Sequence, residues 1–251
     1  MTARLFTFDV RRKMAILPTE EEAIQYSAEY IVKVANDAIE KRGAFYVALS
    51  GGSTPKAIYN VLITQFSDAI DWTKVHLFFS DERAVAPNNP ESNFKMAMDA
   101  GFDRLPIPKS QIHRMQAESE IENGALAYED LLTQLPGSLF DLVMLGMGDD
   151  GHTASLFPRT HGLHAEDRLV IANFIPSKDV WRMSLTMDCI NHSRSILVCI
   201  FGEKKAPMVK KVFYGPYIPD DLPIQRVGTE INPALFVMDK PAAFFNFNNK
   251  T

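Results

Sequence analysis

Short apolar runs alternate with amphipathic stretches along most of the chain. Thr19 and Glu22 form a capping box, apolar residues then recur at helical spacing, and Gly43 ends the pattern. This first segment is therefore predicted to be a helix. Further helices are expected after the loop at 50–55, around 91–100, around 120–134 and over 203–213. Strands are expected at the apolar runs 45–49, 75–79, 140–145, 168–174, 182–187, 195–201 and 234–239.

This alternation is typical of an α/β protein with a largely parallel, twisted sheet and helices on both faces. The 251 residues show no repeat, linker or low-complexity segment, so we expect a single domain over 1–251. In such Rossmann-like sheets, ligands bind outside the carboxyl ends of the strands. The loops expected at that edge are SGGSTP (50–55), SDERAV (80–85) and GMGDDGHT (146–153).

The composition excludes some classes of protein and some classes of binding partner. Hydrophobic residues make up 46% and charged residues 23%, as in ordinary globular proteins, and no apolar run approaches a membrane span or a signal peptide. The net charge of −5 argues against a general nucleic-acid binder but leaves room for an anionic small substrate. Cys189 and Cys199 lack metal-site spacing, so we expect buried, reduced thiols and a cytoplasmic setting.

The segment GMGDDG (146–151) satisfies the dinucleotide pattern G-x-G-x-x-G. That fingerprint requires a long helix after its third glycine, whereas Pro158 and Gly162 interrupt the residues that follow. Asp149 and Asp150 would also repel a pyrophosphate. We therefore do not expect a dinucleotide-binding site.

His152 follows this loop directly, where a short helix could begin. An imidazole takes up and returns protons near neutral pH, and the carboxylate of either Asp149 or Asp150 could orient its ring. The alternative is that His152 only caps the turn while the two acids accept backbone hydrogen bonds.

The SGGSTP loop carries the components of an anion site. Gly51 and Gly52 permit unusual backbone angles, and Ser53 and Thr54 offer amides and hydroxyls at the start of a helix. It is not a Walker loop, because the G-K-[ST] ending is missing. The alternative is an ordinary strand–turn–helix connection with a Ser/Thr cap.

Several cations and one acid complete the candidate chemistry. Asp81 could act as a base and Arg83 could bind a carboxylate or phosphoryl oxygen, although the two could equally form a local ion-pair network. Lys178 and Arg182 follow later in the chain. Lys205 is expected in the first turn of its helix, where its charge opposes the helix dipole and a bound anion would relieve the conflict.

Taken together, these segments resemble the 6-phosphogluconolactonases, in the wider superfamily that includes glucosamine-6-phosphate deaminase. The residues around Lys178 depart from the family pattern, reading SKDVW where Pro-Lys-Pro is common. The matching segments are 50–59, 80–93 and 145–158, with weaker matches at 182–191, 202–206 and 222–239.

The resemblance implies hydrolysis of 6-phospho-D-glucono-1,5-lactone to 6-phosphogluconate, a step of the oxidative pentose phosphate pathway. No metal or cofactor is expected, and a metabolic coupling to glucose-6-phosphate dehydrogenase is implied. His152 would be the general base, and Arg83, Lys178 and loop amides would stabilise the oxyanion. The residues expected to bind the substrate or its phosphate are Gly51, Gly52, Ser53, Thr54, Asp81, Gly148, Asp150, Gly151, Arg182 and Lys205.

Two alternatives stay open. A deaminase would use Asp81 to abstract the proton at C2 of an amino-sugar phosphate and His152 to open the ring. A sugar-phosphate sensor would keep the pocket and bind 6-phosphogluconate without turnover.

Overall fold

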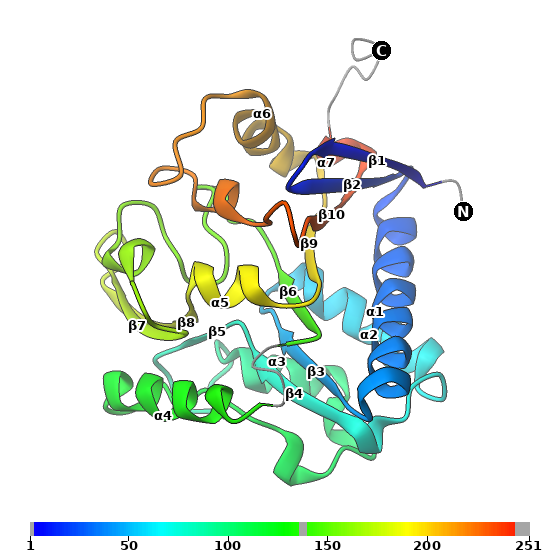
Figure 1. Ribbon diagram of the computed structural model, residues 1–251, viewed down its shortest axis with the longest axis vertical. Helices are drawn as coiled ribbons and strands as arrows, with labels where there is room; N and C mark the ends of the chain where they lie inside the picture. Colours follow the sequence, from blue (N-terminus) through cyan, green and yellow to red (C-terminus); the bar gives the residue numbers. More distant parts are fainter. Residues whose placement is uncertain (1–2, 136–139, 244–251) are drawn as a thin grey trace.

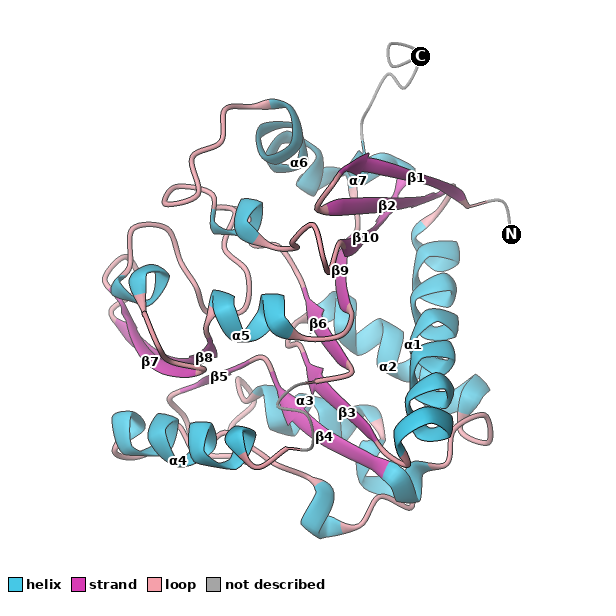
Figure 2. Cartoon of the chain, in the orientation of Figure 1, coloured by secondary structure: helices cyan, strands magenta, loops and turns pink. Residues whose placement is uncertain are grey.

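The structure is a computed structural model that describes residues 3–135 and 140–243 (Figure 1). Within these residues the strands form a large sheet of seven strands and a small sheet of three (Figure 2). The large sheet has the order β1-β2-β10-β9-β6-β3-β4, and all its neighbours are parallel except β1 and β2. Its strands are β1 (Arg4–Asp9), β2 (Arg12–Leu17), β3 (Phe45–Leu49), β4 (Val75–Phe79), β6 (Leu142–Leu145), β9 (Ile196–Ile200) and β10 (Ala234–Asp239).

Helices cover both sides of the large sheet. Helices α1 and α2 lie on one side, and α5 lies with the small sheet on the other (Figure 1). The expected α/β class with a mostly parallel sheet is therefore confirmed. The helices are α1 (Glu20–Arg42), α2 (Ser53–Phe66), α3 (Asn93–Ala100), α4 (Ile121–Thr133), α5 (Met187–His192), α6 (Ala206–Tyr214) and α7 (Lys240–Ala243).

The ends of α1 follow from its sequence. The Thr19 hydroxyl accepts a hydrogen bond from the Glu22 amide at 3.2 Å, as the capping box predicts. Gly43 has a φ of 81° and donates its amide to the Ile39 carbonyl, a left-handed cap that glycine adopts without strain. Both ends of the predicted helix are thus confirmed.

The core is formed by strands with both faces covered. Every residue of β9 and β10 is buried, which explains why these strands are continuous apolar runs rather than alternating ones. Cys189 and Cys199 are buried and free, and burial raises the pKa of each thiol to about 12. Both are buried, as predicted, and the Cys199 thiol also donates a hydrogen bond to the Ser27 hydroxyl at 3.6 Å.

The small sheet corrects one expectation. The predicted strands 168–174 and 182–187 do not join the parallel sheet: they form the antiparallel hairpin of β7 (Val170–Ile175) and β8 (Val180–Leu185). The segment expected as a loop after β4 supplies the third strand, β5 (Asp81–Arg83), which pairs with β8. The small sheet therefore stands beside the carboxyl ends of β3, β4 and β6.

Three further expectations were incomplete. The N-terminal hairpin of β1 and β2 was not predicted. The helix expected over 203–213 is divided into a 3-10 turn, Glu203–Lys205, and α6, so Lys205 is the N-cap of α6 rather than part of its first turn. No helix begins at His152; the chain turns there, with a single bridge between Thr153 and Leu156.

No helix within the described residues is long and apolar enough to span a membrane. The expectation of a single domain over 1–251 stays a prediction.

Candidate active site

A pocket of about 310 Å³ opens at the carboxyl ends of β3, β6 and β9, facing the small sheet. Its size suits a small ligand. Asp150 and Gly151 were predicted to contact a ligand but are not among its lining residues. The predicted site residues that do line it are Gly51, Gly52, Ser53, Thr54, Asp81, Arg83, Gly148, His152, Lys178, Arg182 and Lys205.

The wall at the end of β3 presents the start of α2. The buried Tyr59 hydroxyl donates to the Ser50 carbonyl at 2.8 Å and accepts from its amide at 3.0 Å, which fixes the strand end. Gly52 has a φ of 106° and caps α2 without a side-chain hydrogen bond. The first intrahelical bond runs from the Lys56 amide to the Gly52 carbonyl, so the Ser53 and Thr54 amides stay available to an anion.

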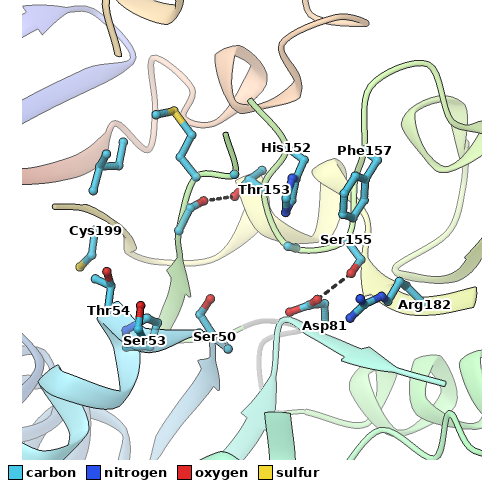
Figure 3. A pocket seen from close by; sticks show the side chains of 18 of the residues that line it. Ser50, Ser53, Thr54, Asp81, His152, Thr153, Ser155, Phe157, Arg182 and Cys199 are labelled. Atoms are coloured by element: carbon cyan, nitrogen blue, oxygen red, sulfur yellow. Dashed lines mark hydrogen bonds between the residues drawn. The ribbon is translucent and has the colours of Figure 1, made fainter. Parts of the chain in front are cut away.

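His152 is held from two directions. Its Nδ1 lies 2.5 Å from Asp150 Oδ1. Its ring stacks on Phe157, with ring centroids 3.9 Å apart, and Figure 3 shows these two rings side by side. Burial tends to raise the pKa of Asp150, but the hydrogen bonds and charge of His152 outweigh it and hold that pKa below its usual range. Because Asp150 occupies Nδ1, Nε2 is the ring nitrogen left to exchange a proton in the pocket.

A lack of side chain at Gly148 makes room for this imidazole. A Cβ at position 148 would lie 2.0 Å from His152 Nδ1 and 2.8 Å from Asp150 Oδ1. The Gly148 amide also donates to the His152 carbonyl at 2.9 Å, which closes the loop. The predicted ligand contacts of Gly148 stay untested, but the structure gives it a steric role beside the histidine.

The two neighbouring aspartates have different partners. Asp149 Oδ1 lies 2.6 Å from Lys205 Nζ, and that ammonium also donates to the Met147 carbonyl at 2.8 Å. The charge conflict expected for Lys205 at its helix start is thus already relieved by a carboxylate of the chain. Of the two candidates, Asp150 supports His152 and Asp149 supports Lys205.

Asp81 is a buried acceptor in the floor of the pocket. The Ser155 hydroxyl donates to its Oδ2 at 2.6 Å (Figure 3). The Asn93 side-chain amide donates to its Oδ1 at 3.0 Å. Gly51 leaves the space that Asn93 fills, since a Cβ there would lie 1.8 Å from Asn93 Oδ1. Both carboxylate oxygens are therefore oriented before any ligand binds.

Arg83 and Arg182 are directly opposed on the paired strands β5 and β8. The buried Nε atoms of both lack a hydrogen-bond partner within the described residues. Burial and the nearby Arg83 charge lower the pKa of Arg182. Two neighbouring guanidinium groups with open donors form a strong site for an anion.

The pocket is strongly cationic within an acidic chain. Within the part of the chain that the structure describes, the pocket is lined by four cations, Arg83, Lys178, Arg182 and Lys205, and by one carboxylate, Asp81. The whole chain, by contrast, carries a net charge of −5. Lys178 Nζ lies 5.0 Å from the centre of the Phe157 ring, a cation–π contact. This arrangement favours a small anionic ligand. Among the described residues, no group of three or more His, Cys, Asp or Glu could hold a metal ion, and the expected metal independence stays a prediction.

Some supporting residues were not predicted as part of the site. Phe157 and Ser155 belong to the same GHTASLFP segment as His152, yet their stacking and bonding depend on the turn that no periodicity reveals. Glu82 is a further supporting residue, in β5. Its buried carboxylate accepts the Asn93 and Phe94 amides at the start of α3, and burial raises its pKa.

Comparison with known proteins gives a consistent result. A family described as glucosamine-6-phosphate isomerases/6-phosphogluconolactonase matches residues 18–236. A 6-phosphogluconolactonase of Chlamydia pneumoniae is 38% identical over 238 residues, covering 94% of this chain and 91% of that protein. The structure of a 6-phosphogluconolactonase from Trypanosoma cruzi has a TM-score of 0.81 and 25% identity, covering 97% of this chain and 99% of that one. A monomeric glucosamine-6-phosphate deaminase, 23% identical, shares the fold with a TM-score of 0.75 over 92% of this chain and 98% of that one.

Proposed function

The chain belongs to the glucosamine-6-phosphate isomerase/6-phosphogluconolactonase family, and from this premise we propose that it hydrolyses 6-phospho-D-glucono-1,5-lactone to 6-phosphogluconate. The observation that carries the proposal is a single pocket that combines an oriented imidazole with four cations. A lactone hydrolase needs a base for water, charge stabilisation for the oxyanion and a site for the phosphate. The pocket offers all three.

His152 is the general base. Its Nε2 takes a proton from water as the water oxygen bonds to the lactone carbonyl carbon. The tetrahedral intermediate then breaks the bond between that carbon and the ring oxygen, and the imidazolium returns the proton to the departing oxygen. Asp150 at Nδ1 supports the charged ring through this cycle. Such proton transfer is typically worth about 10²–10⁴ in rate.

Arg83 and Lys178 stabilise the oxyanion. Arg83 Nη1 donates to the Glu91 carbonyl, which fixes its guanidinium, while its buried Nε is without a partner among the described residues. A donor of this kind contributes about 10²–10³ in rate.

The phosphate binds to the amides of Gly51–Thr54 and to Lys205. Arg182 contributes from the facing wall of the pocket (Figure 3), where a guanidinium can hold phosphate oxygens in a forked geometry. Gly151 and Asp150 lie outside the lining, so their contribution comes through the loop and through His152 rather than by contact with the phosphate.

Asp81 is presented as an oriented acceptor for substrate hydroxyls. Ser155 and Asn93 each donate a hydrogen bond to it, which leaves a further lone pair on each carboxylate oxygen. The sequence relatives, rather than Asp81, favour the hydrolase over the deaminase. The likeness to the deaminase structure concerns the fold alone.

Two assays test the function. Acid release from the lactone, corrected for spontaneous hydrolysis, should exceed any ammonia release from glucosamine 6-phosphate. His152→Ala should lower lactone turnover by about 10²–10⁴ with little change in the Kd of 6-phosphogluconate. His192→Ala, which removes an exposed histidine on α5, is the matched control and should leave turnover unchanged. Ammonia release without lactone hydrolysis would overturn the proposal.

We place this reaction in the cytoplasm, metabolically coupled to glucose-6-phosphate dehydrogenase, whose product is the lactone. The two free, buried thiols suit a reducing compartment. Neither nucleic acid nor membrane is expected as a partner.

A further inference from the structure

The ion pair between Asp149 and Lys205 stands at the edge of the proposed phosphate site. Asp149 Oδ1 lies 2.6 Å from Lys205 Nζ, and the Asp149 side chain is 87% exposed, against 26% for Lys205. The lysine lines the pocket, whereas Asp149 does not. A ligand in the pocket and the carboxylate of Asp149 therefore approach the same ammonium from different sides.

The ammonium has a limited number of donors. Lys205 donates one hydrogen to Asp149 and one to the Met147 carbonyl at 2.8 Å, which leaves the third for a ligand. Two anions bound to one tetrahedral ammonium are only about 4–5 Å apart. At that separation a phosphate dianion and a carboxylate repel each other appreciably, even with solvent nearby.

We propose that Asp149 sets the affinity for the phosphate by competing with it for Lys205, so that both substrate and product are held less tightly than the cations alone would allow. The inference rests on the proposed function, because it takes Lys205 as a phosphate ligand. Asp150, one residue later, carries no such role, since its carboxylate is engaged by His152. The two adjacent carboxylates thus have different roles: Asp150 supports the base, His152, and Asp149 lowers the affinity for the phosphate.

A purely structural role for Asp149 predicts the opposite result. If the ion pair served mainly to anchor the loop, its removal would loosen Lys205 and weaken binding. The anchor does not depend on Asp149 alone, because the bond from Lys205 to the Met147 carbonyl remains. Exposed ion pairs also contribute little to stability, so the fold should tolerate the change. The direction of the affinity change therefore separates the two roles.

Asp149→Asn tests the proposal by calorimetry with 6-phosphogluconate and, in parallel, gluconate. We expect 6-phosphogluconate to bind about 3- to 10-fold more tightly, with a smaller gain at high salt. Gluconate, which lacks the phosphate, should bind the variant and the parent equally. Asp99→Asn is the matched control: it removes the same charge from a lysine ion pair of the same length, 2.6 Å, on α3 away from the pocket, and should change neither affinity.

Lys205→Met completes a cycle of variants. In that background Asp149→Asn should change the Kd of 6-phosphogluconate much less, because no ammonium holds the carboxylate close to the phosphate. Equal or weaker binding by Asp149→Asn alone, or an equal gain for gluconate, overturns the inference. If Lys205→Met leaves the Kd unchanged while the parent protein still hydrolyses the lactone, this inference fails and the proposed function stands. A parent protein that neither binds 6-phosphogluconate nor hydrolyses the lactone would refute both.

Discussion

Replacing Gly148 by alanine tests whether the placement of one imidazole controls turnover. The added Cβ would lie 2.0 Å from His152 Nδ1 and 2.1 Å from its Cε1. Normal contact between such atoms begins near 3.5 Å, so the ring must retreat by roughly 1.5 Å. That movement breaks the 2.5 Å contact with Asp150 and disturbs the 3.9 Å stack on Phe157.

The expected loss follows from this displacement. Moving a catalytic group by about 1 Å can cost about 10² in rate, or roughly 2.7 kcal/mol of transition-state stabilisation. The φ of Gly148 is outside the left-handed region, so alanine introduces no backbone strain of its own. We therefore expect kcat to fall about 100-fold while the Kd of 6-phosphogluconate and the Tm stay close to those of the parent.

Gly146→Ala is the matched control in the same loop. Apart from the adjacent residues, the nearest atom to a Cβ at Gly146 would be the Cys199 carbonyl oxygen, 4.0 Å away. The φ of Gly146 is also outside the left-handed region. Stopped-flow measurement of acid release, with spontaneous hydrolysis subtracted, compares the two variants. Turnover by Gly148→Ala within about threefold of that by Gly146→Ala would show that the position of His152 does not limit the reaction.

Two further predictions concern binding and pH. Arg182→Ala should weaken 6-phosphogluconate binding by about 10- to 100-fold, as expected for a lost charge-assisted hydrogen bond. The control Arg159→Ala, on the exposed surface, should leave the affinity unchanged. Unchanged affinity of Arg182→Ala in calorimetry would show that Arg182 does not bind the phosphate. Burial, with the nearby His76, lowers the pKa of His113 to about 4, and burial also lowers the pKa of His76, so both rings resist protonation in the folded protein. Unfolded histidines bind protons below pH 6.5, so the free energy of unfolding should fall as pH drops from 6.5 toward 4, by at most about 1 kcal/mol per unit after discounting for solvent screening. Urea titrations of the parent and of His113→Gln check this, and equal pH slopes would contradict it.

The sequence predicted best those strands that are buried on both faces. The runs at 45–49 and 75–79 coincide with β3 and β4, because strands of a covered parallel sheet are largely apolar and four of the five residues in each are buried. The hairpin of β1 and β2 was not predicted. Strand β1 is an edge strand with exposed positions, including Leu5, which is 60% exposed, and β2 begins with Arg12 and Lys13, which leaves an apolar run of only four residues. In β1, the charged residues at the two ends, Arg4 and Asp9, obscure the alternation of apolar and polar positions.

The sequence predicted most residues of the candidate site, but it did not predict which of them contact one another. The strand-end loops supply most of the lining, since parallel strands bring their carboxyl ends to one edge. Whether Asp149 or Asp150 reaches His152 depends on backbone direction within a turn, which adjacent identical residues cannot reveal. The opposition of Arg83 and Arg182 depends on an antiparallel pairing between distant segments, and no local pattern specifies such a pairing.

The pairing of β2 with β10 ties the beginning of the chain to its end. Met14 lies opposite Phe236, so β2 gains its second neighbour only after nearly the whole chain has been synthesised. Contacts so distant in sequence slow folding, and until they form, β2 and β9 present unpaired backbone to the solvent. A polypeptide cut short before β10 would thus be inclined to aggregate, because the large sheet is complete only when β10 lies between β2 and β9.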